Sequence, residues 1–377
     1  MNNVVFSRWI GIVALGLAAV SAVSAAPGQN ANGVPDSLMK KLTRGVNITH
    51  WFGYVDPTDT NAMKSYLVED DLQAFKKINL GFVRLCVSPG VIYRNGAPDP
   101  TNLSLVDTGI DKLENAGLAV LWDLHDNGEM KLDAPNQDNS GFVRFWEALA
   151  QHYKGRHERT LVFELVNEPI FQQNPEVWYK LQQQTVEAVR KIDRARTILV
   201  SSSGWNGIDT LAAMKPLPEK NLIYSFHCYD PFLYTHQGAT WTGEQQKAMR
   251  DIPFPSSPEA VAAMIDKIPE QYRDSVRSYG EQRLGKPYLQ SRLEKAKNWA
   301  VENKVPVLLG EFGSYPLVAP KDARARWFDA MREVIGDLGL PNAIWGYDDS
   351  FGLGREKSAD GKVNLDSLTL EHFFQAP

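Results

Sequence analysis

Two glutamates, Glu168 and Glu311, each follow a short apolar run of the kind that forms a buried strand. The runs are L-V-F-E-L-V at residues 161–166 and V-P-V-L-L-G at residues 305–310. If both are parallel strands of one barrel, their carboxyl ends lie on the same rim and bring the two carboxyl groups together. Such a pair suits hydrolysis of a glycosidic bond, in which one group protonates the leaving oxygen and the other attacks the sugar or activates water. Either glutamate alone is better explained as the ion-pair partner of an arginine.

Polar and aromatic side chains also stand in or at the ends of other apolar runs. One of them, Arg84 in F-V-R-L, would be costly to bury without a partner. Stability alone does not require so many polar residues on one rim, so we expect them to surround the two glutamates. The residues predicted to support the site in this way are Asn47, Arg84, His125, Asn167, His227, Tyr229 and Trp345.

The elements that would position these residues repeat along the chain as apolar runs separated by amphipathic stretches. Continuous apolar runs are typical of parallel strands covered on both faces by helices. Eight such units predict an α/β fold, a single (β/α)8 TIM barrel, as the domain formed by residues 27–377. A doubly wound open sheet is the alternative, but no glycine-rich phosphate-binding turn follows any run. The expected strands cover residues 44–48, 81–87, 117–124, 161–166, 197–202, 222–226, 305–310 and 342–347, and helical patterns cover residues 69–78, 141–153, 175–192, 290–303 and 322–338.

Composition limits the possible partners and the redox chemistry. The chain has 377 residues, of which 43% are hydrophobic and 23% charged, which is enough to fill a large core. Its net charge is -5, so the chain lacks the excess of positive charge that binds nucleic acid or anionic lipid, and we expect neither nucleic acid nor a membrane as a partner. Only two cysteines are present, Cys86 and Cys228, which excludes a disulfide framework. They fall in strands on opposite sides of the predicted barrel, so we expect both to be free.

Residues 1–26 have the form of a secretory signal peptide. Arg8 precedes an apolar run that closes with the small residues V-S-A-A, so we expect cleavage after Ala25 or Ala26. A membrane anchor is the alternative, but the run is short for a bilayer span. The sequence therefore predicts a secreted protein, extracellular or periplasmic, which we expect to be a monomer.

Six stretches together resemble the family 5 glycoside hydrolases, cellulase-type enzymes of clan A. They are F-V-R-L, W-D-L-H, V-N-E-P, S-F-H-C-Y, L-L-G-E-F-G and the strand that ends at Trp345, and the resemblance runs from R-G-V-N-I-T-H-W-F to N-A-I-W-G-Y. The resemblance implies that Glu168 is the general acid/base and Glu311 the nucleophile of a retaining hydrolase, with carboxyl groups about 5–5.5 Å apart. No cofactor is expected.

The resemblance and the residue chemistry together predict how each glutamate is tuned. We expect Arg84 and Tyr229 to hydrogen-bond Glu311 and keep it ionised. Glu168 must be protonated at rest, so we expect burial and the charge of Glu311 to raise its pKa. The resemblance also implies that Asn167 contacts the sugar 2-hydroxyl as the transition state forms.

Histidines and aromatic residues complete the predicted site. His125 and His227 are expected to fix substrate hydroxyls or to orient the carboxyl groups. Trp345 is either a core residue or, as we favour, a flat platform for a pyranose ring. Trp205 and Trp241 are equally consistent with a cleft wall and with loop packing.

The stretch H-C-Y-D-P-F-L-Y-T-H-Q-G-A-T-W further resembles a bacterial group of endo-β-1,4-glucanases, some of which accept mannan. That resemblance makes His236 a substrate contact. Two positions depart from the family pattern. Asp126-Asn127 follows His125 where many relatives have a second histidine, and Gly346 follows Trp345 where the nearest group often has glutamate. Both departures bear on the substrate rather than on the mechanism.

Several functions are thus compatible with the sequence, in a definite order. Cleavage of β-1,4-glucan comes first, β-mannan or mixed-linkage glucan second, and an exo-acting β-glucanase third. A metal hydrolase is disfavoured because no H-x-H or H-E-x-x-H spacing is present, and we expect no metal. A secreted carbohydrate-binding protein without activity has no reason to keep both an acid and a nucleophile.

Overall fold

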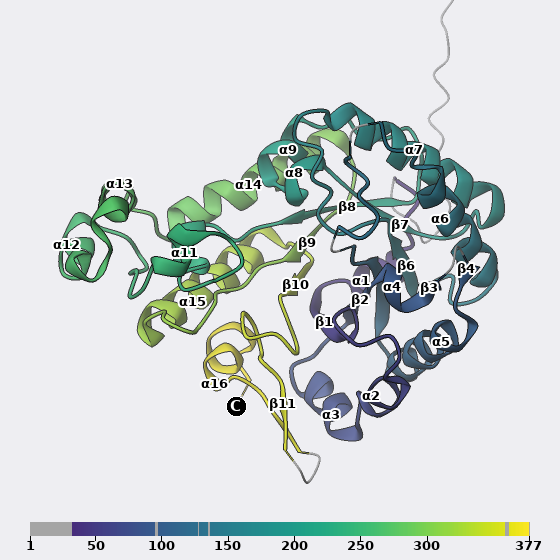
Figure 1. Cartoon of the computed structure of the whole chain (residues 1–377), viewed down its shortest axis with the longest axis horizontal. Coiled ribbons are helices and arrows are strands. Elements are labelled where there is room, and N and C mark those ends of the chain that lie inside the picture. Colours follow the sequence, from purple (N-terminus) through teal and green to yellow (C-terminus); the bar gives the residue numbers. More distant parts are fainter. Residues whose placement is uncertain (1–31, 95–96, 127, 135, 359–361, 377) are drawn as a thin grey trace, which may run out of the picture.

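The computed structural model of the protein describes residues 32–94, 97–126, 128–134, 136–358 and 362–376. These residues form a closed barrel of eight parallel strands surrounded by helices, which confirms the predicted (β/α)8 fold (Figure 1). Around the barrel the strands follow the order β1-β10-β9-β8-β7-β6-β5-β2. Their bounds are β1 Arg44–Phe52, β2 Phe82–Val87, β5 Ala119–Leu124, β6 Leu161–Glu164, β7 Ile198–Ser201, β8 Leu222–His227, β9 Val307–Glu311 and β10 Asn342–Ile344.

All eight runs predicted from the sequence are barrel strands, with shifts of a few residues at their ends. The largest shift is in β1, which continues to Phe52 after an irregularity in its pairing with β2. Two short hairpins lie outside the barrel in the described residues. They are formed by β3 Tyr93–Arg94 with β4 Ala97–Pro98, and by β11 Glu356–Lys357 with β12 Val363–Asn364.

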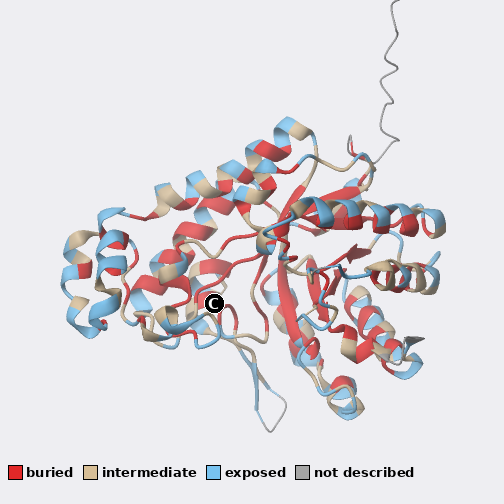
Figure 2. Cartoon of the chain, turned by 45° about the horizontal axis from the view of Figure 1, so that its top comes forward, coloured by how far each residue is buried: buried red, intermediate tan, exposed pale blue. Residues whose placement is uncertain are grey.

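The strands are buried on both faces, as their continuous apolar runs require (Figure 2). Side chains alternate between two layers because successive residues of a strand point to opposite sides. On β5, for example, Leu121 belongs to the cluster inside the barrel, whereas Val120 and Trp122 belong to the cluster beneath the helices. Leu38, on helix α1 (Asp36–Lys41), joins the inner cluster.

Helices cover the barrel with their buried faces inward and their exposed faces outward (Figure 2). Each of the five predicted helical patterns corresponds to an observed helix. The helices of the outer layer and its loops are α2 Thr60–Ser65, α3 Glu69–Lys77, α4 Pro89–Ile92, α5 Pro100–Asn115, α6 Ser140–His152, α7 Pro175–Ile192, α8 Ser203–Asn206, α9 Ile208–Ala213, α14 Lys286–Asn303, α15 Lys321–Leu338 and α16 Ser367–Thr369, with a final π-helical turn at Leu370–Phe374.

The long connection between β8 and α14 is a set of short helices. It extends away from the barrel strands, and α12 and α13 lie at its far end (Figure 1). The Tyr279 hydroxyl donates to the Pro253 carbonyl oxygen at 2.6 Å and ties the extension together. Its elements are α10 Phe232–Thr235, α11 Glu244–Ala248, α12 Pro258–Ala262, the 3-10 turns Ile265–Lys267 and Glu270–Tyr272, and α13 Arg273–Glu281.

Cys86 and Cys228 are both free and buried, as expected. In the part of the chain that the structure describes, no helix combines the length and the apolar character needed to cross a bilayer. The signal peptide predicted for residues 1–26 lies outside the described residues.

Candidate active site

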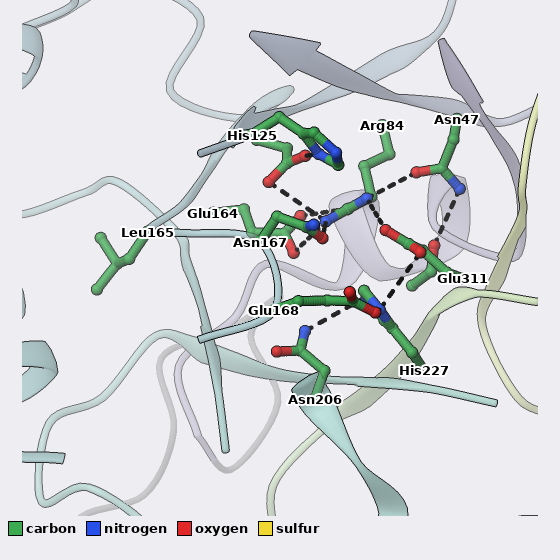
Figure 3. Close-up of polar contacts among 12 residues, drawn as sticks. Asn47, Arg84, His125, Glu164, Leu165, Asn167, Glu168, Asn206, His227 and Glu311 are labelled. Atoms are coloured by element: carbon green, nitrogen blue, oxygen red, sulfur yellow. Dashed lines mark hydrogen bonds and ion pairs between the residues drawn. The ribbon is translucent and has the colours of Figure 1, made fainter. Parts of the chain in front are cut away.

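Arg84 stands at the centre of the charged groups inside the barrel mouth. It is fully buried on β2, and its guanidinium meets three carboxylates (Figure 3). Nη1 donates to Glu311 at 2.8 Å, Nε and Nη2 donate to Glu164 at 2.6 and 2.9 Å, and Nη2 lies 3.2 Å from Asp123. A planar guanidinium with donors in fixed directions holds its carboxylate partners in one arrangement. The buried charge of Arg84 thus has the partners that its position required.

Two amides complete the shell around this guanidinium. Arg84 donates to Oδ1 of Asn47 and to Oδ1 of Asn167, each at 2.8 Å. The Nδ2 group of Asn47 donates to three backbone carbonyl oxygens at 3.0–3.3 Å, those of Gly310, Ala343 and Ile344. Asn47 therefore links β1 to β9 and β10 just below Glu311, which explains an amide in the buried strand β1.

Glu168 and Glu311 face each other across the barrel mouth. They come from the ends of β6 and β9, which lie three places apart in the strand order. Both contact the same atom, Nδ1 of His227, at 2.8 Å from Glu168 and 3.4 Å from Glu311. A carboxylate oxygen of each lies within 4.8 Å of the other. The Tyr229 hydroxyl donates to the second oxygen of Glu311 at 2.9 Å, so both hydrogen bonds expected for Glu311 are present.

His227 acts as a neutral bridge between the two carboxyl groups. The amide of Asn206 lies 3.3 Å from its Nε2 atom (Figure 3). Because an amide NH2 group can only donate, Nε2 accepts and the imidazole proton lies on Nδ1, which faces Glu168. Burial lowers the pKa of His227 to about 4, so the ring is neutral at neutral pH.

Burial sets the pKa of both glutamates. It raises the pKa of Glu168 to about 7, with the positive charges of His125 and Arg84 acting in the opposite direction. Burial also raises the pKa of Glu311, and the neighbouring His227 and Arg84 only partly counter this rise. The charge of Arg84 therefore opposes the effect of burial on the pKa of Glu311, in the direction expected from the sequence. Glu311 is still the better stabilised anion, because it accepts from Arg84 and Tyr229, whereas Glu168 accepts from the neutral His227.

The backbone of Glu168 is strained. Its φ is 45°, in the left-handed region that residues with a Cβ rarely adopt. Such a conformation costs on the order of 1–3 kcal/mol and persists only where the surroundings enforce it. The turn that carries this strain aims the Glu168 carboxyl at His227.

The amino-acid sequence matches the model of a known enzyme family. The family model described as Cellulase (glycosyl hydrolase family 5) matches residues 43–349. The chain belongs to glycosyl hydrolase family 5. The enzyme class expected from the sequence, a glycoside hydrolase, is thereby confirmed.

Individual relatives agree with the family. The chain is 29% identical to Endoglucanase 3 of Fibrobacter succinogenes over 347 residues, which are 85% of this chain and 51% of that protein. It therefore spans about half the length of that relative. It is 23% identical to Endoglucanase C of Acetivibrio thermocellus, covering 82% of this chain and 92% of the relative. The crystal structure of a hyperthermophilic endo-β-1,4-glucanase in complex with substrate superposes with a TM-score of 0.70 at 22% identity, covering 89% and 99% of the two chains.

Trp345 and His125 lie at the same barrel mouth as Glu168 and Glu311. Trp345 is partly exposed, and its ring stacks on that of His125 with centroids 5.5 Å apart and an interplanar angle of 22°. His125 is 3% exposed, and both its ring nitrogens contact protein groups. Nδ1 lies 2.8 Å from Asp123, and Nε2 lies 3.0 Å from the Tyr54 hydroxyl. Trp345 thus presents an open ring to the mouth, while His125 lies behind it.

The two predicted loop tryptophans are exposed. Trp205 is 45% exposed, and its backbone N–H donates at 3.2 Å to the carbonyl oxygen of Pro169, the residue after Glu168. Trp241 is 60% exposed and meets Tyr315 edge-on at 5.1 Å. Neither ring is buried by loop packing, and both remain open to solvent.

His236 lies behind the rim rather than on it. It is 7% exposed, and its ring stacks on Phe232 at 4.0 Å and meets Tyr229 edge-on at 5.0 Å. Its Nδ1 atom pairs with the hydroxyl of Thr235, and burial lowers its pKa to about 3. His236 therefore contacts Tyr229, the residue that hydrogen-bonds Glu311.

Sequence reasoning gave no role to four residues that the structure places in the site. Glu164 and Asp123 are charges inside apolar runs, V-F-E-L-V and L-W-D-L, and the argument applied to Arg84 could have found both. Asn206 ends the short helix α8 and Tyr54 stands in the loop after β1, and no pattern in the sequence distinguishes either of them.

The two departures from the family pattern have structural consequences. Gly346 lies so close to its neighbours that an added Cβ would stand 3.2 Å from the Asn47 carbonyl oxygen and from Cβ of Asp349. Asp126 accepts the backbone N–H of Met130 at 3.1 Å, and burial raises its pKa. Asn127 lies outside the described residues.

The grouping of Glu168, His227 and Glu311 could also hold a metal ion, a possibility that no sequence motif indicated. Their ligand atoms all lie within 4.8 Å of one another. The guanidinium of Arg84, at 2.8 Å from Glu311, already neutralises this carboxylate and repels a cation. The charges around the group thus favour an acid and a nucleophile over a metal centre.

Proposed function

We propose that this family 5 member is a secreted, retaining endo-acting hydrolase of β-1,4-glucan. The observation that carries the proposal is the carboxyl pair, whose nearest oxygens lie within 4.8 Å while both groups contact Nδ1 of His227. Retaining enzymes hold the two groups about 5–5.5 Å apart, whereas inverting enzymes leave roughly 6.5–9.5 Å for a water molecule. The short separation supports direct attack by one carboxylate.

In the first step, Glu311 attacks the anomeric carbon and Glu168 protonates the glycosidic oxygen. The bond from the anomeric carbon to that oxygen breaks, the shortened glucan leaves with the proton, and a glycosyl ester forms on Glu311. Arg84 and Tyr229 orient the attacking carboxylate through their hydrogen bonds at 2.8 and 2.9 Å. With a pKa raised to about 7, Glu168 retains a proton to give near neutral pH.

In the second step, Glu168 is a carboxylate and acts as a base. It accepts a proton from water, the water oxygen bonds to the anomeric carbon, and Glu311 leaves as a carboxylate. The neutral His227 donates from Nδ1 to Glu168 and so keeps the carboxyl group aimed in both steps. Two inversions at one carbon retain its configuration.

Neighbouring residues fit contacts to a sugar in the gap. Oδ1 of Asn167 accepts from Arg84, which turns the amide so that its NH2 group serves as the donor to the 2-hydroxyl. The partly exposed ring of Trp345 fits a pyranose face. Exposed Trp205 and Trp241 extend the apolar surface for further sugar rings. A polysaccharide is therefore the proposed partner.

Glucan is preferred over mannan because the relatives described above are endoglucanases, and no single contact decides between the two sugars. Secretion is inferred from the pattern of residues 1–26. The deciding experiment is a product profile on carboxymethylcellulose, glucomannan and lichenan, together with NMR of the first product formed. Rapid loss of viscosity on carboxymethylcellulose and an initial β-anomer are expected. An initial α-anomer would overturn the retaining mechanism, and monomeric sugar alone would show exo action. Binding without release of reducing ends would make the protein a carbohydrate-binding protein.

A further inference from the structure

A cluster of two carboxylates and one imidazole lies on the face of the barrel opposite the active site. Asp111 and Glu114 stand near the end of α5, shortly before β5, and His157 stands shortly before β6. The amino ends of parallel barrel strands form the face opposite the mouth. One ligand atom from each of the three side chains lies within 4.8 Å of the other two. The mechanism proposed above uses none of them.

The backbone of His157 is held in place at this cluster. Its φ is 55°, in the left-handed region that histidine adopts more readily than most residues. Its carbonyl oxygen accepts the N–H groups of Thr160 and Leu161 at 3.1 and 2.9 Å, and Nη1 of the buried Arg196 at 3.2 Å. The imidazole therefore extends from a fixed point of the chain.

The Glu114 carboxylate determines which ring nitrogen of His157 carries the proton. One of its oxygens contacts Nδ1, and the other accepts from the hydroxyl of Thr160. A carboxylate beside Nδ1 keeps the proton of the neutral imidazole there, so Nε2 has the lone pair. Nε2 is buried and has no hydrogen-bond partner in the part of the chain that the structure describes. Histidines that bind metal ions are held in the same way, with a carboxylate on the other nitrogen.

The Asp111 carboxylate faces this unpaired nitrogen. Its Oδ1 atom lies 3.6 Å from Nε2 of His157, which is too long for a hydrogen bond. Two ligands of one tetrahedral zinc ion are about 3.4 Å apart, close to the observed separation. Both atoms are acceptors, so a cation between them would satisfy both. The side chain of Asp111 is 54% exposed, which gives an ion access from solvent.

A second histidine between the same two parts of the chain lacks this arrangement. Nε2 of His152, on α6, lies 3.0 and 2.9 Å from the two oxygens of Asp107, on α5. Nη1 of Arg156 lies 3.4 Å from the same carboxylate, which is thus already neutralised. Among the described residues, no lysine or arginine forms an ion pair with Asp111 or Glu114.

We propose that Asp111 and His157 bind a zinc ion, with Glu114 positioning the imidazole. Zinc accepts imidazole nitrogen together with carboxylate oxygen, whereas calcium and magnesium prefer oxygen ligands alone. The ion would join α5 to the connection between α6 and β6, and so stabilise the fold without taking part in hydrolysis. The proposal departs from the sequence-based expectation that the chain binds no metal, and it does not depend on the proposed function.

Titration of zinc into the whole protein after dialysis against a chelator tests the proposal. Asp111→Asn keeps the shape of the side chain and is expected to weaken zinc binding at least about tenfold, and Glu114→Gln about 10–100-fold. Zinc should also raise the midpoint of thermal unfolding of the wild type by about 2–4 °C, but not that of Asp111→Asn. Asp274→Asn removes the same charge from an exposed carboxylate on α13 and is the matched control, which should keep the wild-type affinity and shift.

Several outcomes would overturn the inference. Absence of saturable zinc binding would do so, and so would an equal thermal shift with calcium, which would indicate a general effect of cations on acidic side chains. Unchanged affinity in Asp111→Asn would place the ion elsewhere, and zinc at the carboxyl pair of the barrel mouth would be recognised because it inhibits hydrolysis. His157→Asn keeps a residue type that tolerates the left-handed backbone, so a zinc-dependent shift that survives in this variant would also contradict the proposal.

Discussion

Arg84 and Glu164 form a two-point ion pair inside the barrel, with donor–acceptor distances of 2.6 and 2.9 Å and both side chains buried. Burial raises the pKa of Glu164 to about 7, and the charge of Arg84 acts against this rise. The pair fixes the plane of the guanidinium, whose remaining donors reach Glu311, Asn47 and Asn167. Glu164 thus positions Glu311, the proposed nucleophile, through Arg84 without touching it.

Removing Glu164 is therefore expected to destabilise the protein and to impair catalysis together. Glu164→Ala leaves a buried guanidinium without its strongest partner, a change that typically costs about 3–5 kcal/mol. Urea unfolding measures this loss. The matched control is Glu259→Ala, which breaks an exposed pair with Arg283 at 3.4 Å and should leave the unfolding midpoint nearly unchanged, because water screens the pair. Similar losses for the two variants would show that Glu164 is not essential to the arrangement.

The two glutamates of the proposed mechanism should respond differently to truncation. Glu311→Ala removes the nucleophile and is expected to abolish hydrolysis of every glycoside by several orders of magnitude. Glu168→Ala should retain turnover of aryl glycosides whose leaving group needs no proton, because attack by Glu311 does not depend on the acid there. Comparing kcat on a dinitrophenyl glycoside and on a cello-oligosaccharide separates the two. Equal loss of both activities in Glu168→Ala would reverse the assigned roles.

Activity should decline as pH rises through about 7, the pKa to which burial raises Glu168. Above this pH the acid has lost the proton that the leaving oxygen requires. The pH profile of kcat/KM on cello-oligosaccharides measures this limb, and Glu168→Gln should lack it on activated aryl glycosides. A basic limb near the ordinary glutamate pKa of about 4.3 would contradict the raised value.

The raised pKa of Glu168 should also make the stability of the folded protein depend on pH. The folded-state pKa of Glu168 lies above its unfolded value of about 4.3, so the folded protein binds more protons than the unfolded chain in this range. Its contribution to stability is fully present below about 4.3 and is lost as pH rises through about 7. Glu168→Gln should therefore gain stability relative to wild type as pH increases, as thermal unfolding at several pH values would show. A gap that narrows toward high pH would oppose this assignment.

Metal removal distinguishes the carboxyl-pair mechanism from a metal centre at Glu168, His227 and Glu311. Because Arg84 already neutralises Glu311 at 2.8 Å, activity is expected to survive exhaustive dialysis against a chelator within about twofold. The measurement is kcat/KM on carboxymethylcellulose before and after dialysis, with metal content followed in parallel. Loss of activity that zinc restores would support a metal hydrolase.

Much of the fold and the site follows from local sequence patterns. The eight apolar runs are the barrel strands because strands covered on both faces must be apolar along their whole length. Polar residues at strand ends indicated the rim because all parallel strands of a barrel end at one face. Arg84 is a charged residue inside an apolar run, which indicated that it has buried partners of opposite charge. Glu164 is likewise a charged residue inside its own apolar run.

The sequence by itself determined the barrel, the side of it that bears the site, and the two glutamates, since these depend on periodicity and on the residue types at strand ends. Only the tertiary structure decided which atoms meet. That His227 bridges both glutamates, that Asn206 sets its tautomer and that Tyr54 contacts His125 depend on contacts between residues far apart along the chain. The tertiary structure likewise decides that the pKa of Glu311 is raised, because desolvation depends on how completely the folded barrel excludes water.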